Sequence, residues 1–166
     1  MAVEEPQNPD QWERIPITVD SGAVDTVGPK AAGQHFEIEE TEDSLRGRNY
    51  KAANGEPIKN YGQRRITGLT NQGKEIKMKM VVADVTKVLA SVAKMVECGN
   101  TVVFDENESY VLHKRTGVKT PIEKRNGMFV IDMWVKKPRD AMNVEKDRPE
   151  QDFTRLGADQ LYDRVP

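Results

Sequence analysis

The sequence predicts a mainly β domain with one short helix, and two observations support this prediction. Apolar and polar residues alternate over several short stretches, which is the period of a strand with one buried face. Turn signals that contain glycine separate or follow these stretches, at residues 71–73, 116–117 and 126–127. Only residues 88–96 have a helical period instead.

The expected strands follow from the positions of the apolar residues. Ile15, Ile17 and Val19 alternate with polar neighbours and lead directly into Asp20. A second alternating run has its apolar side chains at every other position of residues 76–82. Further strands are expected at residues 101–104, 110–114 and 128–135.

The expected helix covers residues 88–96, where apolar side chains recur at spacings of three and four. Thr86 can cap its start, and Gly99 can end it. We expect its apolar face to lie in the core. Cys98, beside the end of this helix, is expected to be a small buried hydrophobe and not a nucleophile.

Composition limits the domain organisation and the partners. Of 166 residues, 37% are apolar and 31% are charged, which suits a modest core between solvated ends. We expect a flexible N-terminal tail at residues 1–11, the domain at 12–136, and a charged C-terminal tail or linker at 137–166. The net charge of -2 argues against nucleic acid as a partner of this domain. No apolar run approaches the ~20 residues of a membrane span, so no membrane partner is expected.

Few residues are suited to holding a metal ion. The chain has one cysteine, Cys98, and two histidines, His35 and His113, which lie far apart in the sequence. Their spacing does not match a zinc site. We therefore expect no metal and no other cofactor.

The candidate site is the turn that follows the first strand. Asp20 is the candidate catalytic carboxylate, and Ser21, Gly22 and Ala23 are the candidate supporting residues. Gly22 allows a tight turn, the Ser21 hydroxyl can form a hydrogen bond across a subunit interface, and a small Ala23 allows close packing. The same tripeptide is also common in ordinary turns, so the motif alone leaves both interpretations open.

A single carboxylate supplies only half of the chemistry of peptide hydrolysis. One group must act as the base and another as the acid around a single water. Two close aspartates share a proton because both cannot ionise, and their pKa values separate. The chain has one Asp-Ser-Gly, at Asp20, so a two-fold dimer would supply the second copy.

Several motifs occur in the order known from one family. They are VDSGA (19–23), AANGEPI (52–58) followed by YG (61–62), VLASV (88–92), the stretch 99–104, and NGMFVID (126–132). Together, over residues 15–135, they resemble the retropepsin family, and more closely the aspartic proteases of copia-type retrotransposon polyproteins. The resemblance depends on order and spacing, since each motif alone has low specificity.

The resemblance implies a retropepsin-like single-lobe acid-protease β barrel that works as a homodimer. Asp20 and its copy would hold the water. The segment Ala53-Asn54-Gly55-Glu56 would be the tip of a flap hairpin that closes over an extended peptide. The implied role is polyprotein processing, in the cytoplasm or within retroelement particles.

Some positions depart from the family pattern or have another interpretation. Many retropepsins have an aspartate where this chain has Val24, and a glycine where it has Ala90. The alternative function is therefore a non-catalytic peptide-binding or assembly module on the same scaffold. For Asn54-Gly55 the flap is the favoured interpretation, and a plain hairpin turn is its alternative. Residues 31–48 match no motif.

One basic run also has two interpretations. Lys59, Arg64 and Arg65 are expected to form a solvated face, and the alternative is a contact with acidic peptide or RNA.

Overall fold

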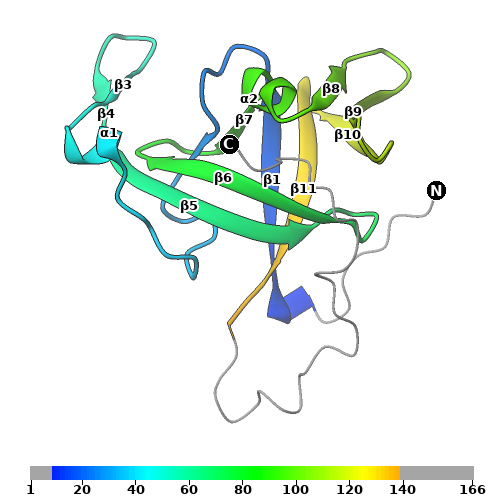
Figure 1. Cartoon of the computed structure of the whole chain (residues 1–166), viewed down its shortest axis with the longest axis horizontal. Helices are drawn as coiled ribbons and strands as arrows, with labels where there is room; N and C mark the ends of the chain where they lie inside the picture. Colours follow the sequence, from blue (N-terminus) through cyan, green and yellow to red (C-terminus); the bar gives the residue numbers. More distant parts are fainter. Residues whose placement is uncertain (1–8, 139–166) are drawn as a thin grey trace.

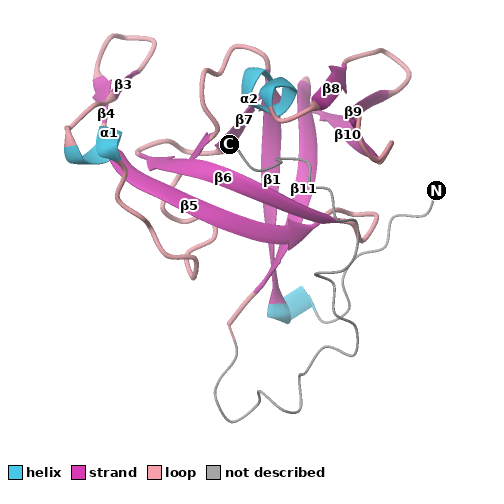
Figure 2. Ribbon diagram, in the orientation of Figure 1, coloured by secondary structure: helices cyan, strands magenta, loops and turns pink. Residues whose placement is uncertain are grey.

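The structure, a computed structural model, describes residues 9–138, and most of this part is β-sheet (Figures 1 and 2). The strands are β1 (Trp12–Asp20), β2 (Val27–Gly28), β3 (Tyr50–Lys51), β4 (Pro57–Ile58), β5 (Asn60–Leu69), β6 (Glu75–Ala83), β7 (Val88–Ser91), β8 (Asn100–Val103), β9 (Ser109–His113), β10 (Lys119–Arg125) and β11 (Met128–Lys136). The helical elements are the 3₁₀ turn η1 (Pro9–Gln11) and the helices α1 (Glu42–Leu45) and α2 (Val92–Glu97). The predicted mainly β class is confirmed.

Strand pairing closes six of the strands into a ring. The order is β1-β7-β2-β6-β5-β11, and β11 pairs again with β1. Along one side β11 pairs with β1, from Trp12↔Lys136 to Thr18↔Val130. On its other side it pairs with β10 near its start and with β5 near its end. In Figure 1, β5 and β6 run across β1 and β11, while β10, β9 and β8 extend the sheet beyond the ring.

The core consists mainly of alternating side chains from the ring strands, joined by Met95 of α2 and by Val111 and Ile122 of β9 and β10. Ile15, Ile17 and Val19 of β1 are buried, as the period of two predicted. The inward residues of β6 are buried in the same way: Ile76, Met78, Met80 and Val82. The expected strands at residues 101–104, 110–114 and 128–135 correspond to β8, β9 and β11.

The predicted helix at residues 88–96 is wrong in its first half. Residues 88–91 form strand β7, which runs parallel to β1 and pairs Ile17 with Val88. The helix begins only after Ser91, whose side chain accepts a hydrogen bond from the Lys94 N–H. The prediction that its apolar face is core also fails at Val96, which is 52% exposed. The four-residue α1, in the segment without a motif, is a second helix that was not expected.

The prediction that Lys59, Arg64 and Arg65 form a solvated face is wrong at Arg64, which is only 5% exposed. Its Nε donates to the Phe36 carbonyl, and its Nη1 donates to the carbonyls of Lys30 and Ala32. Arg64 therefore fixes the loop before α1 onto β5. Burial lowers its pKa, an effect that the charge of Glu13 partly offsets.

The first strand begins at Trp12 and the last ends at Lys136. The predicted tails lie mostly outside the described residues. Within residues 9–138, no helix has the length and apolar character needed to cross a membrane.

Candidate active site

Asp20 is the last residue of β1, and a tight turn follows it. Its Oδ1 accepts a hydrogen bond from the Gly22 N–H at 2.8 Å. The side chain is half-buried, whereas Ser21 and Gly22 are exposed and Ala23 is half-buried. The strand pairs with β7 on one side and β11 on the other, so the position of the carboxylate is set by the sheet.

Ser91 ties the Asp20 turn to the start of α2. It pairs with Asp20 in the parallel ladder and is fully buried. Its hydroxyl donates to the Ala23 carbonyl at 2.7 Å, and its N–H donates to the Thr26 hydroxyl at 3.0 Å. The same hydroxyl caps α2. The expected cap, Thr86, precedes strand β7, and Ser91 is the N-cap instead, in keeping with the preference of serine for this position.

The expected flap residues lie at the tip of a hairpin formed by β3 and β4. The Ala52 N–H donates to the Glu56 carbonyl at 2.8 Å, and the Glu56 N–H donates to the Asn54 side chain at 3.0 Å. Gly55 has φ of 84°, which glycine adopts without strain. The hairpin is confirmed, while its role as a moving flap stays a prediction. Ala53 to Glu56 are exposed.

A cavity of about 230 Å³ lies between this hairpin, the loop after Asp20 and helix α2. Figure 1 shows the hairpin and α2 at the same side of the sheet. The lining residues include Asp25 and Thr26 from the loop, Tyr50 from the hairpin, and Lys94 and Cys98 from α2 and its C-cap. Asp20 is not in the wall. Cys98 lines this cavity and is half-buried. It is therefore more exposed than the buried position that the sequence predicted.

Asp25 is one of two carboxylates in the cavity wall, the other being Asp43, and the sequence does not predict its partners. The Tyr50 hydroxyl donates to its Oδ2 at 3.0 Å, and Lys94 Nζ lies 3.8 Å from its Oδ1. Burial raises the pKa of Tyr50, and the charge of Asp25 raises it further. Val24, at the position where many retropepsins have an aspartate, is 73% exposed. No sequence signal pairs residues 25 and 50, because the contact depends on the tertiary fold.

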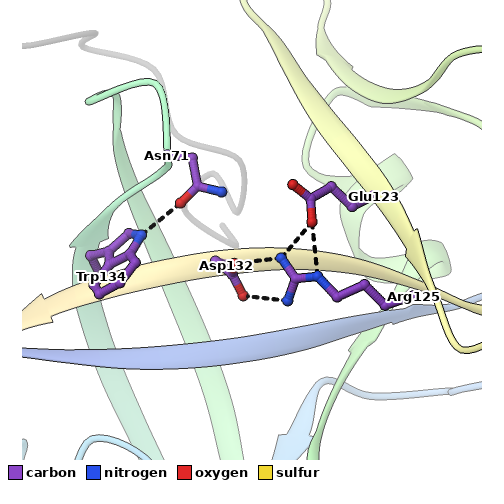
Figure 3. Close-up of polar contacts among 5 residues, drawn as sticks. All are labelled: Asn71, Glu123, Arg125, Asp132 and Trp134. Atoms are coloured by element: carbon purple, nitrogen blue, oxygen red, sulfur yellow. Dashed lines mark hydrogen bonds and ion pairs between the residues drawn. The ribbon is translucent and has the colours of Figure 1, made fainter. Parts of the chain in front are cut away.

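A second cluster of ionisable groups lies between β10 and β11 (Figure 3). Arg125 donates to both oxygens of the buried Asp132 and also to Glu123. These hydrogen bonds, that to Asp132 foremost, raise the pKa of Arg125. The guanidinium holds both carboxylates, so this cluster supports the hairpin and does not offer a free acid and base. Figure 3 also shows Trp134 donating to Asn71.

The histidines and the cysteine are separated in the structure as well. His113 is buried and its Nδ1 lies 3.0 Å from the Thr116 hydroxyl, while His35 is exposed and its ring contacts Phe36. Across residues 9–138, no three His, Cys, Asp or Glu side chains come together as a metal site would require.

Comparisons with known proteins leave the family of the chain open. No protein-family model, no curated protein and no solved structure matches this chain. Its function is therefore argued from the arrangement of its own residues.

Proposed function

We propose that the chain is an aspartic endopeptidase of the retroelement type, active as a homodimer with one Asp20 from each subunit. The observation that carries the proposal is the position of Asp20. The carboxylate lies at the end of β1 and accepts a hydrogen bond from the Gly22 N–H. The Ser91 hydroxyl holds the same turn by donating to the Ala23 carbonyl. One of its oxygens is held by a backbone N–H, which favours a defined orientation.

A second copy would complete the chemistry. Two Asp20 carboxylates at short range would share one proton, so that one takes a proton from water and the other donates to the peptide carbonyl. The described chain itself gives Asp20 no carboxylate partner, since its hydrogen bond goes to the Gly22 N–H. A symmetric dimer is the simplest source of that partner.

Exposed apolar side chains support an interface at this end of the molecule. Val24 is four residues after Asp20 and 73% exposed, and Val96 on α2 is 52% exposed. Met128 begins β11, whose Val130 pairs with Thr18, and it is 37% exposed. Phe104, 38% exposed, packs against Phe129 with ring centroids 4.7 Å apart. These residues come from elements that lie at the same end of the molecule in Figure 1, and exposed apolar side chains that lie together are typical of protein–protein contacts.

The expected substrate is an extended peptide of a polyprotein, in the cytoplasm or within retroelement particles. The cavity between the hairpin, the loop after Asp20 and α2 supports this expectation, because it offers a peptide side chain a place to bind. Main-chain pairing with a β-rich surface is a general way to bind such peptides.

Incubation with a longer precursor and a peptide library tests the proposal, with fragments identified by mass spectrometry. We expect cleavage by the wild type, at least a thousandfold less cleavage by Asp20→Asn, and an acid-shifted or bell-shaped pH profile. Asp84→Asn is the matched control, because Asp84 also follows a strand and is exposed, and its partner Tyr61 lies outside the proposed site. Equal cleavage by wild type and Asp20→Asn contradicts the proposal.

A non-catalytic peptide-binding or assembly module is the second candidate. The observation in its favour is that Asp20 does not line the cavity beneath the hairpin. This candidate requires peptide binding without products after long incubation, and equal affinity of wild type and Asp20→Asn.

A further inference from the structure

The β3–β4 hairpin has little of its own to hold it in place. Its two strands pair only with each other, as Tyr50↔Ile58 and Lys51↔Pro57. Pro57 has no N–H to give to this ladder. A short two-stranded hairpin is marginal in water without packing or further contacts.

One hydrogen bond connects this hairpin to the rest of the described chain. The Tyr50 hydroxyl donates to Asp25 Oδ2 at 3.0 Å, and the other hydrogen bonds of residues 50–58 close the hairpin itself. The position of the hairpin therefore depends strongly on Asp25.

Asp25 is in turn connected to the Asp20 turn and to α2. It lies five residues after Asp20, and its neighbour Thr26 accepts the Ser91 N–H. Its Oδ1 faces Lys94 of α2, whose ammonium also lies 3.6 Å from Glu97. A single carboxylate thus joins the hairpin, the loop after β1 and the helix.

The hydrogen bond between Tyr50 and Asp25 also lies in the wall of the cavity. Asp25, Tyr50 and Lys94 all lie in its wall, so the hydrogen bond from Tyr50 crosses from the hairpin side to the loop side. Loss of this bond would allow the hairpin to move away and would open the cavity on that side.

We propose that Asp25 is a positioning residue, which holds the β3–β4 hairpin over the cavity through Tyr50 and releases it when an extended peptide enters. The coupling between Asp25 and the hairpin is a property of the fold. Its use in admitting a peptide rests on the proposed peptidase function.

The state of Tyr50 agrees with this role. Burial and the neighbouring Asp25 raise its pKa above the ordinary value of 10.0, so the phenol remains a hydrogen-bond donor in alkaline solution as well as at neutral pH. An acceptor that is charged makes a stronger hydrogen bond than a neutral one.

Hydrogen exchange of the full chain, read by mass spectrometry on peptides that cover residues 50–58, tests the coupling. For Tyr50→Phe we expect exchange of the hairpin amides to rise about three- to tenfold, since the lost bond is to a charged but partly solvated group. Asp25→Ala should give a similar rise. The double variant should exchange no faster than Asp25→Ala, because both substitutions remove the same bond.

The matched control is Tyr61→Phe, which removes another hydrogen bond from a tyrosine to an aspartate. Tyr61 donates to Asp84, which follows β6 and is not part of the loop after Asp20. We expect exchange of residues 50–58 to stay within about twofold of wild type in this variant. Unchanged exchange in Tyr50→Phe, or an equal rise in Tyr61→Phe, overturns the proposal.

Kinetics separates this proposal from the proposed function. With a peptide that the wild type cleaves, Tyr50→Phe should change KM by at least about threefold and kcat by less. A wild type that cleaves nothing contradicts the peptidase and leaves the exchange result as the test of the coupling. Unchanged exchange overturns the coupling even where cleavage is observed.

Discussion

Three aspartates of the fold differ in the partners of their carboxylates: Asp20, Asp25 and Asp132. Asp20 accepts one backbone N–H, Asp25 accepts a phenol and faces an ammonium, and Asp132 is held by both arms of a guanidinium. A carboxylate bound bidentately to arginine is held in a strong, fixed contact that stabilises the fold and leaves it poorly placed to exchange protons. Asp20 has no such cation in the contacts of the described chain, which agrees with the proposal that it transfers a proton together with a partner carboxylate.

The pH dependence of stability provides a test at the scale of one residue. The pKa of Tyr50 is raised above its ordinary value of 10.0 in the folded protein. Its contribution to stability is therefore complete below about pH 10 and is lost as the pH rises through the folded pKa. We expect the free energy of unfolding of the wild type to fall more steeply above pH 10 than that of Tyr50→Phe, by at most about 1.4 kcal/mol per pH unit. Urea unfolding at about pH 8 and about pH 11 measures both slopes, and parallel slopes contradict the assignment.

At the scale of elements, the junction of β7 and α2 connects the fold to the candidate site. Ser91 ends a strand that runs parallel to β1, caps the helix, and holds the Asp20 turn through the Ala23 carbonyl. One buried hydroxyl therefore serves three elements.

Substitution of this serine should cost more than loss of an ordinary helix cap. We expect Ser91→Ala to lower the free energy of unfolding by about 2–3 kcal/mol, because it removes the cap and leaves buried polar groups without a partner. Thr41→Ala, which removes the cap of the surface helix α1, should cost only about 0.5–1 kcal/mol. Urea denaturation compares the two variants, and a larger loss for Thr41→Ala contradicts the central place of Ser91.

The elements also show where sequence patterns carry information. Strands β1 and β6 were predicted because their inward positions are apolar at every second residue. The longest strand, β5, was missed because its inward face includes Asn60, Gly62, Arg64 and Gly68, which give no apolar alternation. At β7, apolar spacings of three and four arise where a strand is followed by a helix, so the helical period was misleading.

Of the candidate site, the sequence predicts the local turn at Asp20 and does not predict the long-range contacts around it. The turn at Asp20 follows from local chemistry, whereas the contact between Asp25 and Tyr50 joins residues 25 positions apart. Such a contact depends on how the hairpin, the loop and α2 are placed by the fold. The Arg125–Asp132 pair is local by contrast, since it joins neighbouring strands of one hairpin, but the sequence pattern marks residues 128–135 only as a strand and does not indicate the partner of Asp132.

At the scale of the whole molecule, the ring of strands places one set of features at one end. β1 ends there with Asp20, β11 begins there with Met128, and α2 follows Ser91 beside them. The side chains of Val24 and Val96 are the most exposed apolar groups at this end. In the proposed dimer, a second copy covers these side chains and brings its own Asp20 to this end.

Lysine substitutions on this end test the dimer. We expect Val24→Lys and Val96→Lys each to weaken self-association by at least about tenfold, because each places a charge in an apolar contact. Leu45→Lys is the matched control: Leu45 is 68% exposed, but it lies on α1, which Figure 1 places away from α2. Sedimentation equilibrium gives the dissociation constants, and cleavage activity should fall on dilution in parallel with the dimer. If Leu45→Lys weakens association more than Val24→Lys, the subunits meet through a different face, and two Asp20 carboxylates would not come together in the proposed way.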